Sequence, residues 1–296
     1  MPNYPFMQVD AFTAEPLAGN ACAILFDTDD LDADTMLAVA REQNLSETSF
    51  VRRSEVADFG ARYFTPAEEV PLAGHPTIAT VFALVDSGRL KLEKPRTTMT
   101  LELQVGPIEV EIVTPSGRVE QVIMSQKKPE FMAEHAPTDV VPAFGLEASD
   151  VLPDGPIQVV STGTPQLMVP LRDIECVRRA ALDWQAYADL RRRGGFFSAH
   201  LFCLQGITHG GQTFARHYAI PPDLIEDPFT GSATGGMGAY LWHHGLIENP
   251  RFVAEQGHGM RRPGHAQVEV VGPREDIETV RVGGAAVVVL RGEMTL

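Results

Sequence analysis

The feature that most constrains the fold of this chain is a weak internal repeat. Residues 74–90 and residues 231–247 share glycine, threonine, leucine and glycine at identical offsets, and each segment ends on an apolar residue. Self-similarity of this kind indicates a duplicated structural unit. We therefore expect two similar lobes, a number that 296 residues comfortably form.

Each copy of the repeat predicts a helix of small residues that begins at Gly74 or Gly231 and is closed by Gly88 or Gly245. A helix that is apolar on nearly all sides belongs in the centre of a lobe, with strands around it. Its first-turn N–H groups have no partner inside the helix, so two such helix starts across a cleft would bind an anion. The alternative, two ordinary packed helices with side-chain caps, stays open from periodicity alone.

The rest of the chain mixes both types of secondary structure. Helices are expected at residues 34–42, 184–193 and within 173–181, where apolar residues recur with helical spacing. Alternating or apolar runs bounded by turn residues predict the strands. They cover residues 4–12, 21–26, 49–51, 101–103, 108–113, 120–124, 157–161, 167–170, 199–204, 213–218, 266–271 and 285–290.

Composition excludes several classes of function. The net charge of −15 would repel a polyanion, so nucleic acid is not expected, although a local pocket can still bind a small anionic substrate. No apolar run approaches the length of a membrane span and no secretory leader is visible, which predicts no membrane association and a cytoplasmic protein. The three cysteines are far apart and form no C-x-x-C pair, which argues against disulfides and a thiolate zinc site.

A series of short motifs, in one order along nearly the whole chain, resembles the PhzF-like family of phenazine biosynthesis. The matching segments are 9–13 (VDAFT), 19–21 (GNA), 44–48 (NLSET), 64–66 (FTP), 69–72 (EVPL), 74–75 (GH), 161–163 (STG), 226–228 (EDP), 230–233 (TGSA), 255–257 (EQG), 262–264 (RPG) and 282–284 (VGG).

The resemblance implies a fold like that of diaminopimelate epimerase. This is an α+β fold of two pseudo-symmetric lobes, each a rolled, mostly antiparallel sheet around a central helix. The lobes would be residues 1–117, completed by a returning strand at 281–296, and residues 118–280. The resemblance also implies a homodimer and an isomerase without a metal or organic cofactor, whose founding family activity is isomerisation of a dihydro-hydroxyanthranilate.

One departure from the wider fold bears on mechanism. Epimerases of this fold carry their acid and base as two cysteines directly before the glycine of each central helix, whereas this chain has Ala73 and Thr230 there. Neither side chain can replace a thiolate as a proton acceptor near neutral pH. Racemisation by two thiols is therefore excluded if this alignment holds.

The resemblance assigns catalysis to Glu47, His75 and Asp227. A carboxylic acid can take a proton from carbon and return it elsewhere in the same conjugated system, which makes Glu47 the candidate base and acid. His75 would contact substrate or relay a proton, and its place at a helix start should favour its neutral form. Asp227 would orient His75 or bind a substrate amine. The alternatives are a surface glutamate, a structural histidine and a helix-capping aspartate.

Substrate binding is expected from Gly74, Gly231, Ser232, Asn20 and Ser46. The hydroxyl of Ser232 could hydrogen-bond a substrate carboxylate together with the N–H groups of the two glycines. No metal site is expected, because the histidines lack H-E-x-x-H spacing and clustered carboxylates. Nucleotide-binding glycine motifs and a G-x-S-x-G elbow are also absent from the sequence.

These observations together predict a cofactor-independent isomerase that moves a proton on a small carboxylate-bearing substrate by glutamate acid/base catalysis in the inter-lobe cleft. Two other functions stay open. One is an epimerase or racemase of an amino-acid-like substrate, and the other is a non-catalytic small-molecule-binding protein with the same fold.

Overall fold

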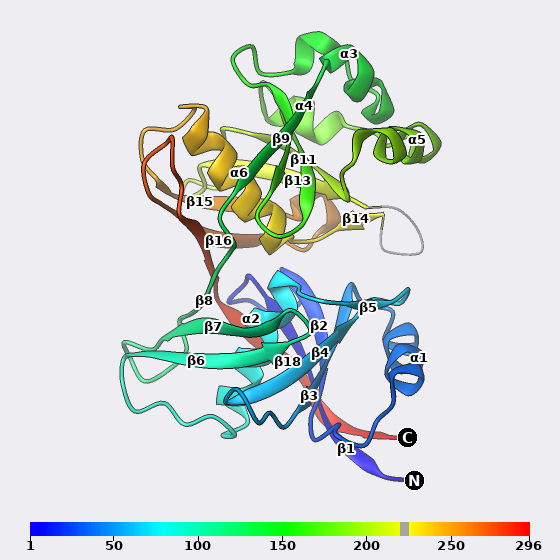
Figure 1. The fold of residues 1–296 in the computed structure, drawn as a ribbon, viewed down its shortest axis with the longest axis vertical. Helices are drawn as coiled ribbons and strands as arrows, with labels where there is room; N and C mark the ends of the chain where they lie inside the picture. Colours follow the sequence, from blue (N-terminus) through cyan, green and yellow to red (C-terminus); the bar gives the residue numbers. More distant parts are fainter. Residues whose placement is uncertain (220–224) are drawn as a thin grey trace. The chain divides into compact units, whose positions relative to one another are not determined.

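A computed structural model describes residues 1–219 and 225–296, which divide into two compact units (Figure 1). Unit 1 comprises Met1–Ser125 and Gly283–Leu296, and unit 2 comprises Gln126–Val282. The chain leaves unit 1 once and returns at its C-terminal end. The sequence had placed these boundaries at 117/118 and 280/281. Within the described ranges, no helix combines the length and the apolar character needed to cross a bilayer.

Unit 1 contains a long sheet and two helices. Its strands are β1 (Asn3–Ala11), β2 (Asn20–Leu25), β3 (Glu47–Arg52), β4 (Phe59–Phe64), β5 (Glu69–Val70), β6 (Arg96–Leu103), β7 (Gly106–Val113), β8 (Gln121–Ser125) and β18 (Ala286–Thr295), and its helices are α1 (Ala33–Gln43) and α2 (Gly74–Asp86). The strand order is β18-β1-β2-β3-β4-β6-β7-β8, in which only β2–β3 and β4–β6 are parallel. The short strand β5 pairs with β4.

Unit 2 repeats this plan with more helices. Its strands are β9 (Glu130–His135), β10 (Ile157–Ser161), β11 (Pro165–Pro170), β12 (Ser198–Cys203), β13 (Thr213–Tyr218), β14 (Glu226–Asp227), β15 (Arg251–Gln256) and β16 (Gly264–Val271), and β17 (Thr279–Gly284) leads back to unit 1. Its helices are α3 (Pro137–Val140), α4 (Ile174–Arg179), α5 (Trp184–Gly194) and α6 (Gly231–His243), with 3-10 turns at Val141–Phe144, Ala148–Asp150 and His258–Met260.

The two sheets share one connectivity. In unit 2 the order is β9-β10-β11-β12-β13-β15-β16, with β14 on β13, and only β11–β12 and β13–β15 are parallel. The two parallel pairs therefore occupy the same positions in the strand order of both units. The helix α6 of unit 2 corresponds to α2 of unit 1. This shared order is the duplication that the repeat predicted, and the predicted α+β fold class is confirmed.

The central helices are buried because their side chains are small or apolar. α2 contacts β1, β2, β3, β8 and β18, and α6 contacts β10, β11 and β16. Strands approach α6 closely: a Cβ atom at Gly238 would lie 2.8 Å from the Val268 side chain. Both helices begin at the predicted glycines, and Gly88 and Gly245, just beyond their ends, have positive φ angles.

Peripheral helices have conventional ends and cover the outer faces of the sheets (Figure 1). The side chain of Asp32 accepts a hydrogen bond from the backbone of Thr35 at the start of α1, and Asn44 ends that helix in the left-handed conformation. In unit 2, α4 and α5 pack on an outer cluster that includes Leu167, Val169, Ala199 and Leu201.

Several strands escaped the sequence prediction. β4 and β15 were not expected, and β3 begins two residues before the predicted segment. β4 reads Phe-Gly-Ala-Arg-Tyr-Phe, in which a glycine and an arginine interrupt the alternation. The arginine is nevertheless satisfied, because Arg62 forms two hydrogen bonds of 2.7 Å with Glu69 of β5. The neighbouring strands thus stabilise β4 as a strand, although the residue pattern of β4 alone predicts a strand only weakly.

The inner face of unit 2 contains an unpredicted pair of histidines. His200 and His217 lie opposite each other on β12 and β13, and their Nδ1 atoms are 3.3 Å apart. Burial lowers the pKa of His217 to about 3, and burial with the neighbouring His217 lowers the pKa of His200 well below its usual value. Both rings are therefore neutral at pH 7, and one Nδ1 atom donates to the other.

We predict that Gly19→Ala destabilises unit 1 by about 3 kcal/mol or more, whereas Gly88→Ala costs about 1 kcal/mol. Both glycines have positive φ, but a Cβ atom at Gly19 would overlap the carbonyl oxygen of Ala11, and one at Gly88 would meet nothing within 4 Å. Thermal or urea unfolding of the two variants measures the difference. Equal losses would show that Gly19 has no special packing role.

We predict that the free energy of unfolding falls as the pH is lowered from about 6.5 toward 3. Below pH 6.5 the unfolded chain protonates His200 and His217 while the folded chain keeps them neutral, so acid favours unfolding. His217→Gln should make this slope shallower, by at most about 1.4 kcal/mol per pH unit. Urea unfolding at several pH values measures the slope, with His209→Gln at an exposed site as control. Identical slopes in all three proteins would contradict the assignment.

Candidate active site

In unit 1 the turn between α1 and β3 positions Glu47. Asn44 closes α1 with a backbone hydrogen bond of 3.0 Å to Ala40, and Glu47 opens the strand in register with Cys22 of β2. The Glu47 side chain is 19% exposed, so it is neither a fully solvated surface group nor sealed in the core. This exposure is compatible with the predicted contact between Glu47 and a substrate.

His75, the second residue of α2, faces this carboxylate. Its Nδ1 atom lies 3.2 Å from Glu47 Oε2 and 3.2 Å from Asn20 Nδ2. Burial lowers the pKa of His75 to about 3, partly offset by a hydrogen bond with the backbone of Ala21. The imidazole is therefore neutral at physiological pH, as expected, although burial rather than the helix start is the main cause.

The amide of Asn20 links this histidine to the turn. Ser46 Oγ donates to Asn20 Oδ1 over 3.3 Å, which directs the NH₂ end of Asn20 toward the His75 ring. Asn20 is 1% exposed and opens β2. The structure thus brings Asn20, Ser46, Glu47 and His75 together at the start of α2.

That start carries no side-chain cap. Ala73 occupies the N-cap position with φ −144° and ψ 146°, and its methyl group cannot accept a hydrogen bond. The Thr77 hydroxyl donates to the Ala73 carbonyl over 2.7 Å and lies 3.1 Å from the Tyr63 hydroxyl. These buried contacts hold the Ala73 carbonyl and the Thr77 side chain in place. Neither contact involves the first-turn N–H groups of α2, so these groups need other partners. Sequence analysis did not predict a role for Tyr63 or Thr77. The only indication in the sequence was that Thr77 is a polar residue within an otherwise apolar helix.

The start of α6 in unit 2 is built differently but is also uncapped. Thr230 occupies the N-cap position without a side-chain cap bond, and its hydroxyl donates instead to the Asp227 carboxylate. Gln256 accepts from the Thr230 backbone N–H at 3.2 Å and donates to the Asp227 carbonyl at 2.7 Å. Gln126 donates to the Gly231 carbonyl at 2.9 Å.

Ser232 follows as the second residue of α6, and Gln166 Nε2 of β11 donates to its Oγ over 3.1 Å. Three buried glutamines, Gln126, Gln166 and Gln256, therefore hold this helix start. Sequence analysis missed all three, because glutamine is ordinarily a surface residue and nothing in its local pattern indicates burial.

The predicted residues thus fall into two groups. Gly74, Asn20, Ser46, Glu47 and His75 surround the start of α2 in unit 1. Asp227, Gly231 and Ser232 surround the start of α6 in unit 2. The roles assigned to all eight stay predictions.

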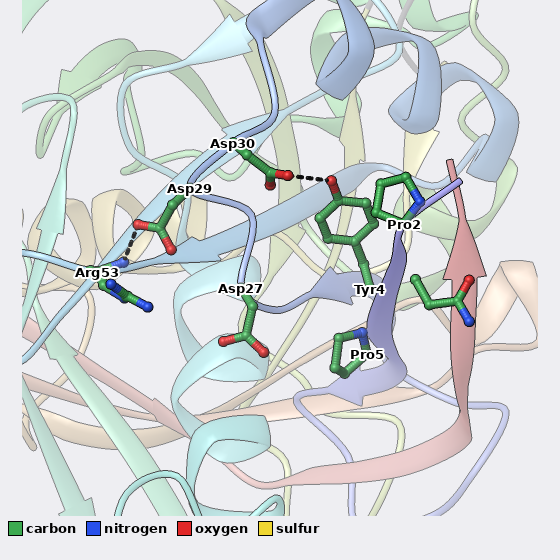
Figure 2. A pocket seen from close by; sticks show the side chains of 8 residues that line it. Pro2, Tyr4, Pro5, Asp27, Asp29, Asp30 and Arg53 are labelled. Atoms are coloured by element: carbon green, nitrogen blue, oxygen red, sulfur yellow. Dashed lines mark hydrogen bonds between the residues drawn. The ribbon is translucent and has the colours of Figure 1, made fainter.

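Outside these groups, the described residues contain no cluster of three or more His, Cys, Asp or Glu side chains able to hold a metal ion. A pocket of about 530 Å³ lies elsewhere on unit 1, between the N-terminal end of β1 and the loop after β2. Figure 2 shows its acidic wall, where Tyr4 donates to Asp30 over 2.9 Å and Asp29 accepts from the Arg53 backbone over 3.0 Å. None of the predicted site residues lines it.

Comparison with known proteins places this architecture in a family. Residues 9–292 match the family model described as phenazine biosynthesis-like protein. The isomerase YfhB of Bacillus subtilis is 33% identical over 266 residues, with 89% of each chain covered. The trans-2,3-dihydro-3-hydroxyanthranilate isomerase of Pseudomonas chlororaphis is 32% identical, covering 98% of this chain and 99% of the relative.

A crystal structure of a PhzF-family phenazine biosynthesis protein from Bacillus anthracis superposes with a TM-score of 0.89 at 31% identity, covering 100% of both chains. Sequence, fold and connectivity therefore agree from end to end. The chain belongs to the PhzF-like family of phenazine biosynthesis-like proteins and is an enzyme of the isomerase class.

Proposed function

We propose that the chain is a cofactor-independent isomerase that moves a proton on a small, unsaturated, carboxylate-bearing molecule. Glu47 removes the proton from carbon, the electron pair delocalises over the conjugated system, and protonated Glu47 returns the proton to another atom of that system. The substrate leaves as an isomer with the same atoms and charge. The observation that carries this proposal is the shared position of His75 Nδ1, between Glu47 and Asn20.

The position of His75 suits a neighbour, Glu47, that acts first as a base and then as an acid. A neutral imidazole has one N–H and one bare nitrogen. The NH₂ end of Asn20 faces the ring, so Nδ1 is the bare nitrogen and accepts from that amide. Once Glu47 carries the proton, its O–H lies 3.2 Å from the same nitrogen, and the imidazole stays neutral throughout.

The uncapped helix starts support an anionic substrate. First-turn N–H groups at α2 and α6 lack side-chain caps, and such groups favour a carboxylate. We propose that the Ser232 hydroxyl and the Gly231 N–H bind the substrate carboxylate, with Gly74 at the other helix start. Asp227, held by Thr230, would bind a substrate amine or orient His75.

The N-cap residues favour Glu47 over a pair of thiols. Ala73 and Thr230 occupy the two N-cap positions, and Cys22, Cys176 and Cys203 are all buried. Burial, together with the charge of Glu47, raises the pKa of Cys22 well above its usual value, so Cys22 is not a thiolate base. The isomerase of Pseudomonas chlororaphis makes trans-2,3-dihydro-3-hydroxyanthranilate the first substrate to test. The homodimer stays a prediction.

We predict that Glu47→Gln lowers kcat by about a thousandfold while leaving the fold and ligand affinity largely intact. The amide keeps the shape of the side chain but cannot accept a proton near neutral pH. Steady-state turnover of trans-2,3-dihydro-3-hydroxyanthranilate measures the effect. Glu42→Gln, an exposed glutamate at the end of α1, is the matched control and should retain full turnover. Comparable turnover by both variants would remove Glu47 from the mechanism.

We also predict that prolonged dialysis against EDTA leaves turnover unchanged, because a carboxylate base and helix-start donors need no Lewis acid for this proton shift. Activity before and after dialysis, with and without added zinc, measures this. Loss of activity on dialysis followed by recovery with zinc would overturn the metal-free proposal.

A further inference from the structure

The start of α6 contains a contact that the proposed proton transfer does not use, the one between Gln166 and Ser232. Gln166 is 2% exposed and lies on the inner face of β11, since its neighbours Leu167 and Val169 belong to the outer cluster. Its Nε2 atom reaches Ser232 Oγ over 3.1 Å. A buried polar side chain aimed at a half-buried hydroxyl calls for a physical explanation.

In the structure Nε2 is the amide atom that faces Ser232, and Oε1 of Gln166 has no partner among the described residues. An amide NH₂ group can only donate, so in this orientation Ser232 Oγ is the acceptor and its single proton is not used in this bond. Among the residues that the structure describes, the Ser232 side chain makes no second hydrogen bond. The hydroxyl proton is therefore available to a ligand, beside the first-turn N–H groups of α6.

The other unit contains a related arrangement. Asn20 lies on β2, which corresponds to β11 in the shared strand order, and its Nδ2 atom lies 3.2 Å from Nδ1 of His75, the second residue of α2. In both units a buried amide thus approaches the second residue of the central helix. At His75 the carboxylate of Glu47 lies 3.2 Å from the same nitrogen, so the amide is not its only polar neighbour. At Ser232, by contrast, the Gln166 amide is the only group among the described residues that forms a hydrogen bond with the hydroxyl.

We propose that Gln166 is a positioning residue that holds Ser232 as a hydrogen-bond donor. Around Ser232, the first turn of α6 then offers the hydroxyl proton and the N–H groups as donors, which suits a carboxylate, while Asp227 stays the acceptor at the same helix start. This inference rests on the proposed function, because it concerns how the same site selects its substrate class.

The test uses the full-length protein and two probes, anthranilate and aniline. Anthranilate is a stable amino-carboxylate, and aniline lacks the carboxylate but keeps the ring and the amine. Titration calorimetry of both probes is compared for the wild type, Gln166→Met, Gln166→Glu, Ser232→Ala and the double variant Gln166→Met/Ser232→Ala. Thermal unfolding of each variant establishes that it is folded at the assay temperature.

We expect Ser232→Ala to weaken anthranilate about tenfold, the effect of one hydrogen bond to a charged group. Gln166→Met should weaken it about threefold, because the hydroxyl then has to be ordered by the ligand. Gln166→Glu should cost at least as much as Ser232→Ala, since a carboxylate there accepts the Ser232 proton and repels the anion. In the Ser232→Ala background, Gln166→Met should have no further effect. Aniline affinity should not change in any variant.

Gln158 provides the matched control. It is 6% exposed on the neighbouring strand β10, and it contacts Met132 and His244 rather than Ser232. Gln158→Met should leave the affinity for anthranilate unchanged.

Three results would overturn the inference. They are a Gln166→Met loss that persists in the Ser232→Ala background, equal losses for anthranilate and aniline, and no measurable anthranilate binding by the wild type. If Ser232→Ala weakens anthranilate but the Gln166 variants do not, only this inference fails. If Ser232→Ala itself has no effect, the carboxylate site in the proposed function fails as well, whereas turnover by the Glu47→Gln variant tests the proton transfer separately.

Discussion

The fold depends on one constraint: a helix buried inside a rolled sheet cannot satisfy its first-turn N–H groups by itself. In α2 the N-cap residue is Ala73 and in α6 it is Thr230, and neither caps the helix. A buried donor without a partner is costly, so these N–H groups need acceptors from outside the helix. We propose that a substrate anion is one of these acceptors.

The duplication supplies this place twice, and the two copies have diverged in chemistry. Around α2 the second helix residue is His75, whose Nδ1 lies within reach of both a carboxylate and an amide. Around α6 the corresponding residue is Ser232, which accepts from Gln166. We propose that the first arrangement exchanges a proton with the substrate and that the second binds the substrate carboxylate.

The sequence predicted the structure best where the local residue pattern and the packing of the folded chain favour the same element. The repeat located both central helices at their observed first residues, Gly74 and Gly231, because a run of small and apolar residues followed by a glycine is typical of a buried helix and its C-terminal end. The helix expected at 34–42 and the strand expected at 49–51 also correspond to α1 and β3, which the turn before Glu47 connects.

Other features were beyond the reach of the sequence because they depend on contacts distant along the chain. β4 is a strand because its neighbours pair with it, not because of its own alternation. Gln126, Gln166 and Gln256 look like surface residues until the sheet of unit 2 encloses them. The pair of His200 and His217 exists only because β12 and β13 are adjacent and in register.

The central claim is that Glu47 takes a proton from a substrate carbon. The most direct measurement is a single turnover of trans-2,3-dihydro-3-hydroxyanthranilate deuterated at the carbon that gives up its proton, followed by NMR. The account predicts that the wild type removes the label from that carbon and turns over more slowly than with unlabelled substrate, and that the label stays in place with Glu47→Gln. Removal of the label at the same rate by that variant, or isomerisation with the label still on its original carbon, would contradict it.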